Sequence, residues 1–444
     1  MHNDLMSAVD RLLPSIRADL ESLIRIPSVS AAGFDPTEVR RSAQAVVELM
    51  HDAGLRNTQL LEVDGAHPAA FGEIPAPDGA PTVLLYAHHD VQPPGPDEIW
   101  TTPAFDPTER DGRLYARGSA DDKAGIAVHL GAIRAHDGAP PCGVKIFVEG
   151  EEEIGSLNLG RFLDQYTELL EADAIVIADS ENWRVGTPAL TTSLRGLVDC
   201  VIEVRTLEHG VHSGQFGGAF PDALTVLCRT LATLHDDAGR VAVPGLVEAD
   251  SDPLDLTEAE LRTQAEALPG TQLIGSGSVT GRTWSMPAVS VLAIDAPPVA
   301  EAINQLLPSA RAKVSLRIAP GDDPIRAMDA LIAHLEANVP WGAAVTVTPG
   351  AAGDAIALDA RGPAYDAYRA AFAAAWGTAT AEIGVGGSIP FVSAFQAAYP
   401  NATILLTGVA DPTSRTHGPD ESLDLGEFRR GILAEAIALR LIAG

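Results

Sequence analysis

The chain has 444 residues, more than one hydrophobic core usually supports, so two domains are expected. Apolar residues make up 46% of it, an ordinary globular composition, and 60 acidic residues against 30 lysines and arginines give a net charge of −30. This charge disfavours nucleic acid and anionic membranes as partners and favours cations. The N-terminus lacks a basic segment followed by an apolar core, and no run of about 18 apolar residues occurs, which predicts a cytoplasmic protein.

The first half of the chain shows alternating helix-like and strand-like patterns. Two helices are predicted over residues 5–25 and 36–53, because apolar residues recur at helical spacing before Pro27 and before Gly54. Further segments follow in the order strand 82–87, helix 122–136, strand 144–149, helix 157–170 and strand 174–178. This alternation predicts an α/β fold with a mostly parallel sheet and helices on both faces, whose functional groups gather at the carboxyl ends of the strands.

The pattern changes near residue 194. The predicted elements are then strand 197–205, helix 221–234, a polar insertion 235–283, strands 286–295 and 311–318, helix 323–337 and strand 344–348. Without the insertion, this order is that of an α+β ferredoxin-like domain. From about residue 351 the α/β pattern resumes, with a strand over 402–406 and a closing helix from about 425. We therefore predict one domain formed by residues 1–193 and 351–444, interrupted by an inserted domain over residues 194–350.

Three cysteines bear on the compartment. Cys142, Cys200 and Cys228 are odd in number, widely spaced and set in apolar or strand-like surroundings. They are therefore expected to be reduced, buried thiols rather than a disulfide framework or a zinc knuckle.

Histidine and acidic residues gather where the predicted strands end. In Tyr86-Ala87-His88-His89-Asp90, which ends an apolar run, alternation along a strand points His88 and Asp90 the same way and His89 the other way. This arrangement suits a histidine ligand held by a neighbouring carboxylate. Four similar clusters follow, at residues 117–123, 149–156, 178–180 and 416–421.

Each cluster also has an ordinary structural explanation. Asp122 opens a predicted helix and could be a simple cap, and the four glutamates within residues 149–153 could be a solvated turn. However, such dense negative charge repels itself unless cations or water screen it, and a divalent ion would neutralise it. Four of the five clusters also end or closely follow core strands of one predicted sheet, which favours a common site.

The clusters resemble, in order, the signature motifs of the M20 metallopeptidases, the family of carnosinase-type dipeptidases, glutamate carboxypeptidase, aminoacylase and succinyl-diaminopimelate desuccinylase. The resemblance covers essentially the whole chain and implies two divalent metal ions, Zn most readily and Mn or Co as alternatives. It implies a cis peptide bond after the bridging carboxylate. The implied roles are Asp121 as the bridge, His88 and Asp179 at one metal, Glu153 and His417 at the other, Asp90 orienting His88, and Glu152 as general acid and base.

The resemblance extends to the inserted domain, which would serve as a lid and dimerisation domain. The segment around His212 resembles the family's lid histidine motif, whose histidine reaches the oxyanion across a dimer interface. Arg317 resembles the arginine that binds the substrate carboxylate, and Gly387 and Ser388 lie in a segment implied to contact substrate. As structural alternatives, His212 could anchor a glycine-rich turn and Arg317 could be a surface strand residue.

The sequence thus predicts a homodimeric enzyme of the carnosinase-type dipeptidase branch, which hydrolyses the amide bond of dipeptides or short peptides with two metal ions. The choice of branch rests on residues 86–93 and on the insertion 235–283. The main alternative is an N-acyl-amino-acid deacylase or desuccinylase with the same metal chemistry. A non-catalytic binding protein on the same fold would need a defect that the intact ligand set does not show.

Overall fold

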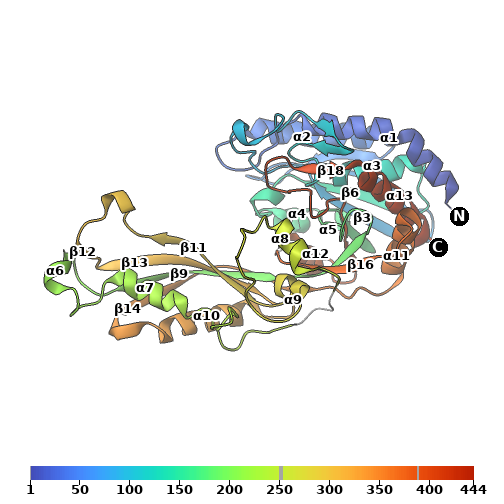
Figure 1. The fold of residues 1–444 in the computed structure, drawn as a ribbon. Helices are drawn as coiled ribbons and strands as arrows, with labels where there is room; N and C mark the ends of the chain where they lie inside the picture. Colours follow the sequence, from blue (N-terminus) through green and yellow to red (C-terminus); the bar gives the residue numbers. More distant parts are fainter. Residues whose placement is uncertain (1, 250–253, 388–389) are drawn as a thin grey trace. The chain divides into compact units, whose positions relative to one another are not determined.

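The computed structural model describes residues 2–249, 254–387 and 390–444 (Figure 1). Its internal contacts divide the chain into two compact units. The first comprises Met1–Thr192, Leu358–Ile383 and Pro390–Gly444, and the second comprises Ser193–Ala357 and Gly384–Ile389. Among the described residues, no helix is both long and apolar enough to cross a membrane.

A mixed sheet forms the centre of the first unit. Its strand order is β1 (Arg56–Leu61), β2 (Ala69–Ile74), β6 (Gly143–Glu149), β3 (Thr82–His88), β7 (Ala174–Ile177), β17 (Thr403–Leu406) and β8 (Ala189–Leu194), and two short strands, β15 (Ile356–Ala357) and β16 (Ala381–Val385), also pair with β8. The four strands β6, β3, β7 and β17 are parallel, whereas β1, β2 and β8 run antiparallel to their neighbours.

The expectation of a mostly parallel sheet is therefore correct for the centre and wrong for the edges. Sequence patterns did not reveal β1 and β2, and only residues 62–68 connect them. Parallel neighbours need a crossover of a dozen or more residues, so a connection this short leaves only an antiparallel pairing.

Helices cover both faces of this sheet, as predicted. They are α1 (Asn3–Ile24), α2 (Pro36–Asp52), α3 (Lys123–Ala135), α4 (Leu159–Gln165), α5 (Thr167–Leu170), α11 (Pro363–Trp376), α12 (Pro390–Ala398) and α13 (Leu425–Ile442). Along β3, Leu85 and Ala87 belong to the core that α1, α3 and α13 complete. Tyr86 points to the other face, where its ring stacks on Phe391 of α12 at 4.8 Å between centroids. The period of two along the strand thus produces two separate helix-covered faces.

Short elements complete the first unit. A three-stranded sheet has the order β18 (Ser422–Asp424), β5 (Arg113–Tyr115) and β4 (Thr108–Arg110), and 3₁₀ turns lie at η1 (Asp97–Ile99) and η2 (Glu152–Ile154). Of these, η2 directly follows β6, and β18 directly follows the last of the five polar clusters.

The second unit is built on an antiparallel sheet with the order β11 (Ala288–Asp295), β13 (Ser309–Ile318), β9 (Gly196–Arg205) and β14 (Ala344–Gly353). The helices α7 (Ala223–Ala232) and α10 (Pro324–Ala337) pack on one face of it, against the alternating buried residues Val198, Cys200, Ile202 and Val204 of β9. Its remaining elements are β10 (Val211–His212), α6 (Ser213–Phe216), α8 (Glu258–Gln264), α9 (Val279–Trp284), η3 (Val299–Glu301), β12 (Gln305–Leu306) and η4 (Pro340–Gly342).

All three cysteines are free thiols, as expected, but one is not buried. Cys142 and Cys200 lie in the two cores, whereas Cys228 is exposed. It lies on the outer face of α7, next to Leu227, which faces the core. The apolar surroundings of Cys228 in the sequence reflect the amphipathic helix and not the position of the thiol itself.

Candidate metal centre

The parallel strands of the first unit bring the polar clusters to one edge of the sheet. The paired ends of β3 and β6 place His88 opposite Glu149. Glu152 and Glu153 follow β6 in η2, and Asp179 lies two residues beyond β7. Because carboxyl ends of parallel strands meet at the same edge, segments far apart in the sequence become neighbours there.

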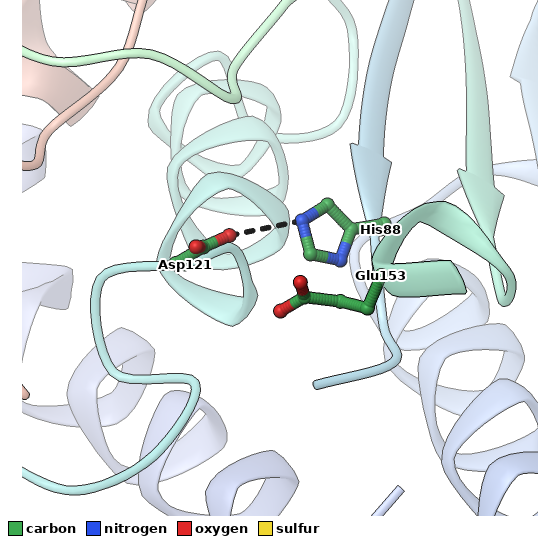
Figure 2. A group of neighbouring side chains, drawn as sticks. All are labelled: His88, Asp121 and Glu153. Atoms are coloured by element: carbon green, nitrogen blue, oxygen red, sulfur yellow. Dashed lines mark hydrogen bonds and ion pairs between the residues drawn. The ribbon is translucent and has the colours of Figure 1, made fainter. Parts of the chain in front are cut away.

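His88 is fully buried and faces a group of carboxylates. Its Nε2 lies 3.1 Å from Oδ1 of Asp121, 3.9 Å from Oδ2 of Asp179 and 4.0 Å from Oε2 of Glu152. Figure 2 shows the imidazole facing Asp121, with that contact drawn, and the carboxylate of Glu153 beside the pair. One imidazole nitrogen surrounded by carboxylate oxygens is an arrangement that suits a shared cation.

Asp121 lies between two histidines. Its Oδ1 faces His88, while its Oδ2 is 3.0 Å from Nε2 of His417, and that same nitrogen is 3.1 Å from Oε2 of Glu153. The two oxygens of Asp121 therefore face two different groups of potential metal ligands, one containing His88 and the other containing His417 and Glu153. A cis peptide bond joins Asp121 to Asp122, as the resemblance implied.

Asp90 contacts both His88 and the η2 turn. The Nδ1 of His88 is 3.1 Å from the backbone oxygen of Asp90 and 3.4 Å from its Oδ1. The carboxylate of Asp90 also accepts hydrogen bonds from the Ser30 hydroxyl at 2.6 Å and from the backbone amides of Glu152 and Glu153 at 3.2 and 3.1 Å. One buried carboxylate thus fixes the histidine ring and the two adjacent glutamates.

Both ordinary explanations of the acidic clusters are wrong. Asp122 occupies the N-cap position of α3, but its side chain caps nothing and instead accepts a hydrogen bond from the backbone amide of His88 at 3.3 Å. In the glutamate-rich segment, Glu149 and Glu151 are buried, so the segment is not a solvated turn. Glu151 there accepts a hydrogen bond from the backbone amide of His67 at 2.7 Å.

The electrostatics of the cluster indicate an excess of negative charge. Burial, followed by the charge of Asp179, raises the pKa of Glu152 to about 9, and burial raises the pKa of Asp179 to about 7. Hydrogen bonds with Asp121 and Glu153 raise the pKa of His417 to about 10. A divalent ion bound among these buried carboxylates would lower the raised pKa values of Glu152 and Asp179 and displace their protons.

These residues fit two divalent ions. Ligand atoms of His88, Asp121 and Glu153 lie within 4.8 Å of one another, as do those of His88, Glu152 and Asp179. Imidazole nitrogen and carboxylate oxygen are donors that Zn²⁺ and Mn²⁺ accept, and a carboxylate with its two oxygens facing different histidines can bridge two ions.

The other two histidines near the sheet have structural partners. The Nε2 of His89 points away from the cluster and lies 2.9 Å from the backbone oxygen of Pro68. His129 is buried, with Nδ1 2.8 Å from Glu435, so its role is structural. His209, for which the sequence offered no motif, is exposed.

Glu149 is a further buried acid beside the centre. It accepts a hydrogen bond from the Tyr86 hydroxyl at 2.7 Å, and burial raises its pKa to about 8. In the unfolded chain a glutamate has a pKa near 4.3, so between these values the unfolded chain releases a proton that the folded protein keeps. The free energy of unfolding therefore falls by about 1.4 kcal/mol per pH unit over this interval.

Glu149→Gln should remove this pH dependence, because an amide does not titrate and still accepts the Tyr86 hydrogen bond. In metal-depleted protein, the free energy of unfolding of the variant relative to the parent should rise by a few kcal/mol from pH 5 to pH 8, as a slope of about 1.4 kcal/mol per pH unit implies. Urea unfolding at four pH values measures it. The same substitution at the exposed Glu48 is the control, and a constant difference at Glu149 would contradict the expectation.

The remaining predicted site residues lie in the second unit. His212 ends β10, is exposed, and its Nδ1 accepts a hydrogen bond from the backbone amide of Gly214 at 3.0 Å, so it does anchor a glycine-rich turn. Arg317 lies half-buried on β13, paired with Ala288 and Leu197 on the flanking strands. Gly387 lies two residues beyond β16, whereas Ser388 lies outside the described residues.

A second arginine accompanies Arg317. Burial, and next the charge of Arg317, lower the pKa of Arg195 to about 10. Arg195 donates a hydrogen bond to the backbone oxygen of Gly386 at 3.1 Å and another to Met286 at 3.2 Å. Two neighbouring guanidinium groups favour an anionic ligand, and only one of them was identified from the sequence.

Sequence reasoning also missed two residues inside the clusters that it singled out. Arg117 and Glu421 are both fully buried and form an ion pair, with Nη1 of Arg117 2.6 Å from Oε2 of Glu421. Neither is adjacent in the sequence to its partner, so the pairing has no local signal. The sequence offered only two signs, a charged residue at the start of the cluster 117–123 and another at the end of the cluster 416–421.

The sequence profile of "Peptidase family M20/M25/M40" matches residues 84–440. The chain is 36% identical over 404 residues to a cysteinylglycine-S-conjugate dipeptidase of Corynebacterium striatum, covering 89% of this chain and 88% of that protein. It is 27% identical to the Cys-Gly metallodipeptidase DUG1 of Candida albicans over 467 residues, 96% of this chain and 94% of that protein. The crystal structure of human carnosine dipeptidase 1 shares the fold, with a TM-score of 0.81 and 22% identity, covering 99% of this chain and 98% of that chain.

The match of the family profile and the identity to the bacterial dipeptidase both extend over most of the chain, and the structure gathers the family's motifs at one edge of the sheet. The chain belongs to peptidase family M20/M25/M40.

Proposed function

We propose that this peptidase hydrolyses the amide bond of dipeptides and short peptides at a centre of two divalent metal ions. The observation that carries the proposal is the placement of Asp121, whose two oxygens lie 3.1 and 3.0 Å from two different histidines. The relatives named as a dipeptidase and a metallodipeptidase support the substrate class and the need for metal.

Five residues would hold the ions. Asp121 would contact both, His88 and Asp179 would complete one position, and Glu153 and His417 the other. Zn²⁺ suits these donors best, and Mn²⁺ and Co²⁺ also suit them. When bound, such a pair of ions polarises the substrate carbonyl and makes a water molecule acidic enough to attack it.

Glu152 would move the proton. Its carboxylate lies 4.0 Å from His88, within the cluster, while its backbone amide is held by Asp90. It would take a proton from the attacking water and pass it to the leaving amine. Asp90 would act by positioning, because it fixes the ring of His88 together with Glu152 and Glu153.

The second unit would bind the substrate and serve as the lid. We assign the recognition of the substrate carboxylate to Arg317, supported by the neighbouring charge of Arg195, and contacts to the peptide to Gly387 and Ser388. The backbone beside Gly387 is held from within the second unit, because Arg195 donates a hydrogen bond to the backbone oxygen of Gly386.

Arg317→Ala should raise KM mainly for substrates with a free α-carboxylate, since a guanidinium fork binds a carboxylate through two parallel hydrogen bonds. A dipeptide and its C-terminal amide should be compared under identical conditions. The loss should be at least about tenfold for the dipeptide and much smaller for the amide. An equal loss for both substrates would mean that Arg317 supports structure.

We further propose a homodimer formed through the second unit, in which His212 stabilises the oxyanion in the neighbouring subunit. The exposure of His212 supports this, because its Nε2 forms no hydrogen bond with the described residues while Nδ1 holds the turn. A reducing location such as the cytoplasm is supported by the three free cysteines.

Mixed dimers of His212→Ala and Glu152→Gln subunits test this assembly. Each heterodimer would contain one site with both residues intact and one site with neither. After random exchange, verified by mass, the mixture should recover up to about a quarter of wild-type activity, since half of the dimers are heterodimers with one good site in two. Inactive heterodimers would remove the support for a role in the neighbouring subunit.

A substrate panel distinguishes the proposal from the deacylase or desuccinylase alternative, which the named relatives do not favour. The metal-loaded protein should be tested on dipeptides, tripeptides and N-acyl amino acids with the same C-terminal residue. We expect the highest kcat/KM for a dipeptide. A preference for acyl substrates would overturn the assignment.

A further inference from the structure

Glu421 holds the backbone of the loop that carries Asp121. Its Oε1 accepts hydrogen bonds from the backbone amides of Ala120 at 2.9 Å and Asp121 at 3.2 Å, and its Oε2 accepts from the amide of Gly118 at 3.1 Å. The carboxylate is completely buried. Three amides of one short loop are thus fixed by a residue about 300 positions away in the sequence.

Arg117 connects this arrangement to the second ligand loop. Its Nη1 donates to Glu421, and its Nη2 donates to the backbone oxygen of His417 at 3.0 Å. The guanidinium is buried and spans both partners with two different nitrogens. The pair therefore links the loop of Asp121 to the loop of His417 through a single rigid fork.

The loop of His417 needs such support. Arg415, His417 and Asp420 all adopt positive φ, at 55°, 63° and 55°, a region that non-glycine residues rarely occupy and that persists only where the surroundings impose it. The side chain of His417 is 57% exposed, so packing around the imidazole contributes little to its position. The hydrogen bond from Arg117 ties the main chain of His417 to a fully buried side chain.

We propose that Arg117 and Glu421 are positioning residues that set the distance between Asp121 and His417, and with it the affinity of the metal position that these two ligands share. This rests on the proposed metal ligation. Partners behind metal ligands commonly change metal affinity by about 10-fold to 100-fold when they are replaced. We expect the position completed by His417 and Glu153 to weaken, and the position completed by His88 and Asp179 to change less.

Two substitutions isolate the link. Arg117→Lys keeps the buried positive charge but cannot reach both Glu421 and His417, and Glu421→Gln keeps the shape while turning a donor toward the amides or toward Arg117. If either variant fails to fold by circular dichroism, the double variant Arg117→Met with Glu421→Gln replaces it, because it leaves no unpaired buried charge.

The chain offers a closely matched control. Glu427 is also fully buried and accepts four hydrogen bonds, one of them from Nη1 of Arg430 at 2.6 Å. None of its donors lies in the loop of Asp121 or in that of His417. Glu427→Gln therefore reports the general effect of removing such a charge from the first unit.

Calorimetric titration of metal-depleted protein with Mn²⁺ gives the two affinities, and electron paramagnetic resonance reports whether the two ions are coupled. We expect both linking variants to lose one affinity by at least about 10-fold and the coupled signal with it, while Glu427→Gln stays within about threefold of the parent. The inference is overturned if the linking variants bind both ions like the parent, or if Glu427→Gln loses as much. A parent protein that does not bind two ions would overturn the proposed function as well.

Discussion

Glu152→Gln should lower kcat by about two to four orders of magnitude while the protein keeps its fold and both metal ions. The amide has the shape of the carboxylate but cannot accept a proton, and Glu152 is not among the five proposed ligands. Because proton transfer occurs in the transition state, the loss should appear in kcat and not mainly in KM. Steady-state kinetics and metal analysis on the same preparation measure both quantities.

The neighbouring Glu151 provides the control for this change. It is buried in the same segment, but its carboxylate is occupied by the backbone amide of His67 and by Asn158 at 2.8 Å. Glu151→Gln should therefore keep kcat within about tenfold of the parent, since no proton carrier is lost. Near wild-type turnover of Glu152→Gln would remove Glu152 from the mechanism.

Asp121→Ala should disturb both metal positions, whereas His417→Ala should mainly weaken one. Asp121 places one oxygen beside His88 and the other beside His417, so its loss removes a ligand from each group. His417 contacts only Asp121 and Glu153 within this cluster. Asp121→Ala should then bind less than one ion per chain under conditions that fill both positions of the parent.

Metal content after equilibrium dialysis, together with calorimetric titration, shows this asymmetry. His89→Ala is not a suitable comparison, because that imidazole is buried against Pro68 and its loss would leave a cavity. The exposed His209 is the better control. Two intact positions in Asp121→Ala would show that the bridge has been assigned wrongly.

Much of the fold could be predicted because local patterns and tertiary structure agree. The helix at 5–25 has one apolar stripe and the strand at 82–87 is a continuous apolar run, and both elements are present at nearly those residues. The polar clusters could be assigned to one site because four of the five end or closely follow strands of a sheet whose central strands are parallel. The sheet thus converts distance in the sequence into proximity at one edge.

The missed features depend on contacts that have no local signature. The strands β1 and β2 carry too few apolar residues in alternation to stand out, and they are determined by pairing, of β2 with β6 and of β1 with β2. The helix α8 in the polar insertion did have a signal, because Thr257 and Glu260 form a capping box. The pairing of Arg117 with Glu421 and the proximity of Arg195 to Arg317 arise only when distant segments meet.

Two ions are proposed to act together on a dipeptide, and a single titration can test this. Metal-depleted protein is titrated with Mn²⁺ while the initial rate of dipeptide hydrolysis is recorded at saturating substrate. We expect little activity without metal and a rate that reaches its maximum only near two equivalents per chain. Full activity at one equivalent, or hydrolysis that persists in excess chelator, would contradict it.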